Sequence, residues 1–72
     1  MDPDANIAAQ RRLIARLRAH PGDQDVRAEL AGHLDAFIDW LAVGGFPPAA
    51  SGWRQVTQEA AALLATATEG VS

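Results

Sequence analysis

Two pairs of side chains in this 72-residue sequence have the spacing that could support chemistry on one side of a helix. Glu29 and His33 are four residues apart, as are Asp35 and Asp39, so each pair would project from a single helical face. A metal site needs at least three converging ligands, and the chain has only two histidines and no cysteine. We therefore expect a flanking histidine and solvated carboxylates, with no metal and no cofactor.

Catalysis by acid–base or nucleophilic chemistry is not indicated either. A carboxylate pair would need a concave pocket to shift its pKa values, and three short helices rarely enclose one. No hydroxyl group lies in a nucleophile-elbow sequence or at a known catalytic spacing from a histidine. The hydroxyl groups considered are those of Ser51, Thr57, Thr66 and Thr68. The sequence thus predicts a protein that is not an enzyme.

Hydrophobic periodicity predicts three helices in a single domain. Asp2 suits the N-cap of the first helix with Pro3 at its first position, and Asp23 and Ser51 suit the N-caps of the other two. No segment alternates with the two-residue period of a strand. The prediction is an all-α three-helix bundle, and so small a core would gain from homodimerisation. The three predicted helices span residues 3–19, 24–43 and 51–68.

Each predicted helix has an apolar side for the core. In the second helix this side is roughly 160° wide, which is typical of a helix packed between two neighbours. The expected core positions are Ile7, Gln10, Leu13, Ile14 and Leu17 in the first helix; Val26, Leu30, Leu34, Phe37, Ile38 and Leu41 in the second; and Trp53, Val56, Ala60, Leu63, Leu64 and Ala67 in the third.

The formal net charge is −3, but its distribution is uneven. Residues 1–20 carry four arginines and two aspartates, whereas residues 21–43 carry one arginine and five acids. We expect these segments to be antiparallel neighbours that complement each other's charge. The alternative is a basic helix for DNA or RNA, against which the overall acidity counts. That helix would use Arg11, Arg12, Arg16 and Arg18.

The N-terminal segment has no apolar stretch like that of a signal peptide, and no run approaches the roughly 18 apolar residues of a membrane span. The absence of cysteine is typical of a cytoplasmic protein. We therefore expect a cytoplasmic protein with no membrane partner.

The segment DWLAVGGFPPAASGW, residues 39–53, contains both tryptophans of the chain. Gly44 suits the position after a helix where glycine adopts the left-handed conformation. Phe46 precedes Pro47 and is thereby restricted to extended geometry, and Pro47 and Pro48 stiffen the connection. The segment should therefore hold one shape. No strand precedes it and no phosphate-loop spacing is present.

This segment resembles a pattern in small proteins of actinobacteria and their phages that have no assigned biochemistry. The resemblance implies an accessory role in host interaction and supplies no active site. It departs from the pattern at Ser51–Gly52, which lengthen the spacing to the last tryptophan. The matching residues are Asp39, Trp40, Leu41, Gly44, Gly45, Phe46, Pro48 and Trp53.

The sequence predicts a non-enzymatic protein–protein interaction module, such as an adapter or inhibitor that acts on a host protein. An exposed Trp40 and Phe46 would form an aromatic anchor for a partner, and the alternative is that both rings are buried. Small residues at Ala28, Gly32 and Ala36 form a candidate self-association surface, and the alternative is that they only populate an exposed face of an alanine-rich protein. The predicted partner-binding residues are Trp40, Phe46, Pro47, Pro48 and Trp53, flanked by Asp35 and Asp39.

Overall fold

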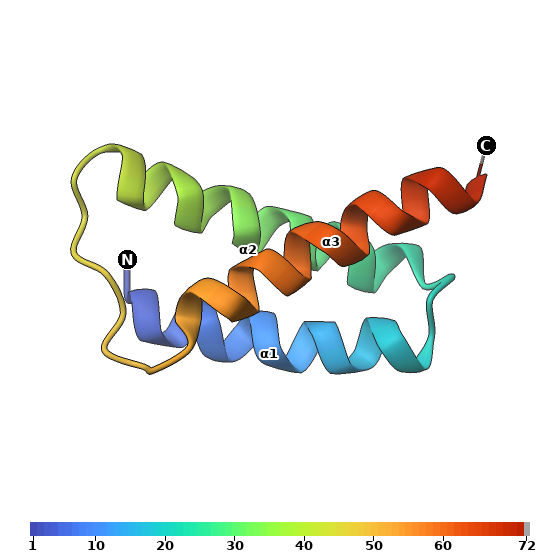
Figure 1. Cartoon of the computed structure of the whole chain (residues 1–72), viewed down its shortest axis with the longest axis horizontal. Helices are drawn as coiled ribbons and strands as arrows, with labels where there is room; N and C mark the ends of the chain where they lie inside the picture. The colour runs from blue at the N-terminus through green and yellow to red at the C-terminus, as the bar shows by residue number, and fades with distance from the viewer. Residues whose placement is uncertain (72) are drawn as a thin grey trace.

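Three helices make up the computed structural model, which describes the backbone of residues 1–71 and the side chains of residues 1–65 (Figure 1). They are α1 (Pro3–Ala19), α2 (Gln24–Ala42) and α3 (Trp53–Val71). α1 and α2 form an antiparallel hairpin, and α3 crosses in front of it in the view of Figure 1. Residues 1–71 contain no strand. The predicted all-α three-helix bundle is therefore confirmed.

Aspartate side chains start the first two helices. The Asp2 Oδ1 accepts hydrogen bonds from the backbone N–H groups of Asp4 (3.0 Å) and Ala5 (3.2 Å). The Asp23 Oδ1 likewise accepts from two N–H groups of the first turn of α2, both at 3.1 Å. Each cap satisfies two of the donors that a first helical turn leaves unpaired, so both predicted N-caps are confirmed.

The start of α3 differs from its prediction, because the helix begins at Trp53 and Ser51 is not its N-cap. Gly52 precedes the helix with a φ of 76°, a left-handed conformation that favours glycine. Its carbonyl accepts the first helical hydrogen bond, from the N–H of Val56 at 3.1 Å. The sharp turn before α3 thus depends on Gly52. α2 ends at Ala42 with Val43 as its C-cap, and α3 extends to Val71.

The core lies where the three helices meet, and it contains most of the expected apolar side chains. Phe37 is fully buried and meets Trp53 edge to face, with ring centroids 5.5 Å apart. Leu41, Trp53, Leu63 and Leu64 are partly buried at the margin. Ala67 lies outside the residues whose side chains are described. The buried core residues are Ile7, Leu13, Ile14, Leu17, Val26, Leu30, Leu34, Phe37, Val56 and Ala60.

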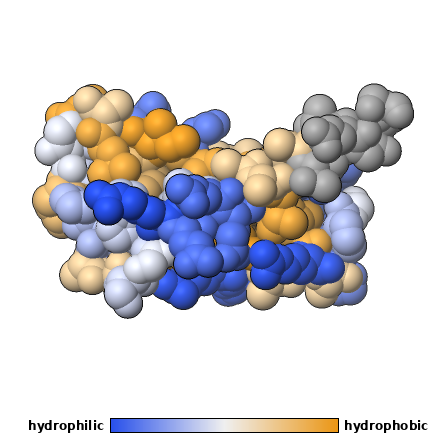
Figure 2. Space-filling model, in the orientation of Figure 1, coloured by the Kyte–Doolittle hydropathy of each residue, from blue (hydrophilic) through white to orange (hydrophobic). Residues whose placement is uncertain are grey.

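Ile38 was expected in the core, but the structure leaves it 50% exposed. The buried residues of α2 occupy a sector only roughly 80° wide, and Ile38 lies about 40° beyond Leu34 at its edge. In Figure 1, it is the second half of α3 that passes over α2. Figure 2 shows apolar surface over the C-terminal half of α2. The apolar side of α2 is therefore wider than its two neighbours cover.

A buried polar network joins all three helices. The Gln10 side chain is fully buried, and its Nε2 donates to the Oδ1 of Asn6 at 2.8 Å. The Nδ2 of Asn6 donates to the carbonyl of His33 on α2 at 3.1 Å. From α3, the Thr57 hydroxyl donates to the Oε1 of Gln10 at 3.4 Å. Buried amides need such partners, so the network specifies how α1 meets α2 and α3.

Candidate functional site

The chain leaves α2 through a Schellman motif. The N–H of Gly45 donates to the carbonyl of Trp40 at 2.8 Å, and the N–H of Gly44 donates to the carbonyl of Leu41 at 3.1 Å. Gly44 has a φ of 90°, which confirms the predicted left-handed glycine after the helix. This turn directs the following residues back over the last turn of α2.

Phe46 folds back onto Trp40, and together with Gly45 these residues form what we call the aromatic cluster. The indole N–H of Trp40 donates to the carbonyl of Phe46 at 2.8 Å. The two rings meet edge to face, with centroids 5.3 Å apart and planes at 84°. Gly45 lies against the indole so closely that a Cβ there would overlap the ring. The cluster therefore has a defined geometry.

The Gly45→Ala substitution is expected to destabilise the protein by about 1–3 kcal/mol, because the added methyl group displaces the indole and breaks its hydrogen bond. Urea unfolding followed by circular dichroism measures this change. Gly32→Ala is the matched control, since a Cβ at Gly32 meets nothing within 4 Å and lies inside a helix. It should instead stabilise by up to ~1 kcal/mol. Equal effects of the two substitutions would contradict the close packing at Gly45.

Phe46 combines this fixed geometry with exposure. Its side chain is 64% exposed, whereas the indole of Trp40 beneath it is half-buried. The two rings are therefore not both buried, which was the condition that would have excluded an aromatic anchor. One largely exposed apolar ring thus packs against Trp40.

The loop between α2 and α3 is also tied to α1 at its far end. The Asp4 Oδ1 accepts the N–H of Ala50 at 2.9 Å, and Nη2 of Arg11 donates to the carbonyl of Ser51 at 3.1 Å. Pro48, two residues before Ala50, is buried. No pattern in the sequence indicates the contact between Asp4 and Ala50, because nothing in it shows that residues 46 positions apart meet. The loop is thus fixed at both ends.

The remaining predicted partner-binding residues do not join the aromatic cluster. Trp53 packs against Phe37, with the Arg54 guanidinium carbon 4.9 Å from its ring centroid. Asp35 and Asp39 are exposed, but they lie about 140° and 100° around α2 from Trp40. The structure therefore brings together Trp40 and Phe46, with the exposed Pro47 next in the chain, and places the other residues elsewhere.

The arginines of α1 do not form one free basic stripe. Arg11 bonds to the loop, and Arg18 pairs with Glu59 of α3 at 3.1 Å. Arg12 and Arg16 are exposed and have no partner within residues 1–65. α1 and α2 are antiparallel neighbours, as expected, but in the same part of the chain no ion pair joins them. Two of the four arginines of the nucleic-acid alternative are engaged within the chain.

Several of the residues first considered for chemistry have structural contacts. Nδ1 of His33 lies 2.8 Å from the carbonyl of Glu29, one helical turn earlier. No group of three potential metal ligands occurs among the side chains described. Ser51 binds Arg11 through its carbonyl and Thr57 belongs to the buried network. The side chains of Thr66 and Thr68 lie outside the described residues.

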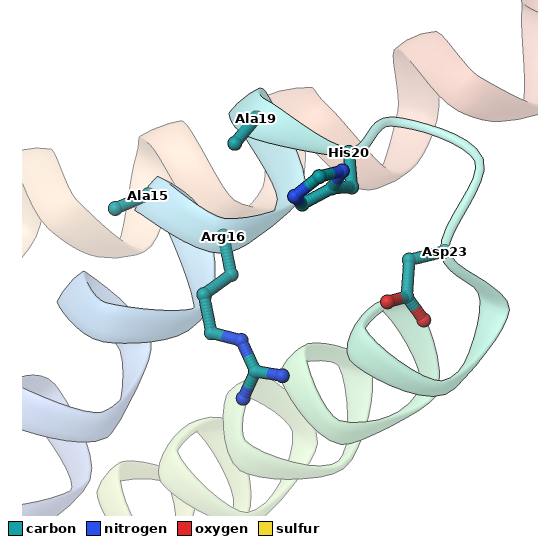
Figure 3. A pocket seen from close by; sticks show the side chains of 5 residues that line it. All are labelled: Ala15, Arg16, Ala19, His20 and Asp23. Carbon is teal, nitrogen blue, oxygen red and sulfur yellow. The ribbon is translucent and has the colours of Figure 1, made fainter.

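An open hollow of about 750 Å³ lies at the turn between α1 and α2 (Figure 3). Two alanines of α1 give it an apolar lining, and Arg16, His20 and Asp23 surround them. The Asp23 Oδ1 already caps α2, and the backbone N–H of Asp23 donates to the carbonyl of His20 at 3.0 Å. The two alanines are Ala15 and Ala19.

Comparison of the chain with protein-family models, curated proteins and solved structures gave no match. None of the helices, over the residues described, has the length and apolarity required to cross a membrane.

Proposed function

We propose that this chain is a non-enzymatic protein–protein interaction module, an adapter or inhibitor that binds another protein through the aromatic cluster. The contact surface consists of the exposed ring of Phe46, the adjoining edge of Trp40 and the exposed Pro47. The Phe46 ring enters an apolar pocket of the partner.

The observation that supports this proposal is the 64% exposure of Phe46 in a segment whose backbone and ring contact Trp40. Binding usually orders exposed side chains and loops, at a cost of about 0.5–1.5 kcal/mol for each side chain. Here the indole hydrogen bond, the edge-to-face contact and the two ends of the loop already hold the segment in place. Aromatic side chains presented in this way are typical anchors of protein interfaces.

A host protein is the partner that the resemblance to small actinobacterial and phage proteins favours. The same resemblance and the absence of cysteine favour action in the cytoplasm. These features extend the proposal from the kind of contact to its setting.

The Phe46→Ala substitution is expected to weaken partner binding roughly 30-fold or more, the loss typical of a central anchor. Affinity capture from a nuclease-treated actinobacterial lysate identifies the partner, and isothermal titration with the purified partner then measures the affinity of each variant. Ile38→Ala is the control, because it removes another exposed apolar side chain on the opposite flank of α2 and should leave the affinity unchanged. A partner that binds the Phe46→Ala variant as tightly as the parent would contradict the proposal.

A further inference from the structure

The outward side of α2 carries an acidic surface that nothing in the described protomer covers. Asp35 and Asp39 are exposed and have no cationic partner within residues 1–65. Ile38 on one flank is 50% exposed, and Val43 on the other flank is 81% exposed. We call these four residues and the exposed Ala42 the acidic face. It combines two carboxylates with two large aliphatic side chains that are exposed to solvent, and exposed apolar groups beside polar ones are typical of contact surfaces.

The outward side of α1 carries the complementary surface, which we call the basic face. Arg12 and Arg16 are exposed and unpaired within the same residues. The hollow shown in Figure 3 lies on this side, with its alanine lining next to Arg16. Asp23 is the one acid that lines the hollow, and its Oδ1 is engaged in capping α2. The basic face consists of Arg12, Ala15, Arg16, Ala19 and the hollow.

The two faces match in charge and in spacing. Asp35 and Asp39 are one helical turn apart, and so are Arg12 and Arg16, so each pair spans about 6 Å along its helix. Small alanines on α1 allow a second helix to approach closely, and the hollow offers room for an aliphatic side chain. The exposed aliphatic side chains and the alanines of the open hollow each remain uncovered in a single copy.

We propose that this chain self-associates by docking the acidic face of one copy on the basic face of another. Asp35 and Asp39 pair with Arg12 and Arg16 of the second copy, and Ile38 covers the alanines of its hollow. The contact pairs charges of α1 and α2 that no ion pair between these helices engages within residues 1–65.

The contact is heterologous, because the two faces belong to different sides of the protomer. α1 and α2 pack against each other through their buried sides, so their outward faces point away from the hairpin. Contact between unlike surfaces adds copies head to tail unless a ring closes. This contact involves neither Trp40 nor Phe46, so its test is independent of the test of the proposed function.

Sedimentation velocity of the full chain tests the proposal between about 10 μM and about 1 mM, the range of weak associations. The mean mass should rise above 7.6 kDa with concentration, and raising the salt from about 0.05 M to about 0.5 M should reverse the rise. Two double variants should each weaken association roughly tenfold. One is Arg12→Gln, Arg16→Gln, and the other is Asp35→Asn, Asp39→Asn. A parent that stays monomeric throughout would overturn the proposal.

Mixing the two double variants is the decisive arm, because one retains an intact acidic face and the other an intact basic face. The mixture should form a 1:1 dimer and grow no further, whereas each variant alone stays largely monomeric. The control is Gln55→Glu, Gln58→Glu, at exposed positions of α3. It lowers the net charge by the same amount as the double arginine variant and should associate like the parent. If the parent associates but the two double variants do not form a dimer when mixed, this contact is refuted. It is also refuted if either double variant associates as strongly as the parent.

Discussion

Replacing Phe37 with alanine is expected to leave most of the protein unfolded at room temperature. The side chain is fully buried where α2 meets α3, and its ring contacts Trp53 edge to face. Phe→Ala at such a position costs about 3–5 kcal/mol, through lost burial and the cavity left behind. A single core of this size rarely supplies more than about 3–5 kcal/mol in total. The loss therefore matches the whole stability of the fold.

Urea unfolding followed by far-UV circular dichroism, at one fixed protein concentration, measures this effect. Phe46→Ala is the matched control, since the same atoms are removed from a ring that is 64% exposed. It should cost no more than about 1.5 kcal/mol, the value of one aromatic pair, because Phe46 contacts Trp40. Similar losses at the two positions would show that Phe37 is not the centre of the core.

The second large effect is expected in the buried network of Asn6 and Gln10. Asn6→Leu leaves the Nε2 of Gln10 without its acceptor, and Gln10→Leu leaves the Oδ1 of Asn6 without its donor. Burying one unsatisfied polar group costs about 1–3 kcal/mol, so each single substitution should destabilise the protein by roughly 2 kcal/mol.

The double substitution Asn6→Leu, Gln10→Leu removes both polar groups together and should cost clearly less than the sum of the single substitutions. A coupling of about 1–2 kcal/mol in the double-mutant cycle would show that the two amides act as a pair. The cycle is measured from urea unfolding of the four proteins. Additive losses would mean that the hydrogen bond between the two side chains contributes nothing specific.

The helices could be predicted from the sequence because their signals are local. Asp2 and Asp23 accept from N–H groups two and three residues further on, and Pro3 has no N–H that needs a partner, so spacing alone identifies these helix starts. Gln10 could be placed among core residues by its position in the repeat. Asn6, its partner one turn earlier, was missed, although polar residues at that spacing on a buried face are a recognisable signal.

The candidate site was predictable only in part. Gly44 and the restriction of Phe46 by Pro47 are local effects, so the sequence indicates a turn and a stiff segment. Whether Trp40 and Phe46 face solvent depends on what the rest of the chain covers. Asp35, Asp39 and Trp53 were grouped with them because they are close in sequence, but a helix distributes neighbouring residues around its axis, and Trp53 belongs to another helix.

By itself, the sequence determined three helices, most of their buried positions and the glycine turn after α2, because each depends on residues within one or two helical turns. The tertiary structure alone decided that Ile38 stays half exposed and that Asp4 anchors Ala50. It also decided that Arg11 bonds to the loop and Arg18 to α3, and neither to α2. These outcomes depend on the angle at which α3 crosses the hairpin. That angle results from packing among residues far apart in the chain, which no local pattern encodes.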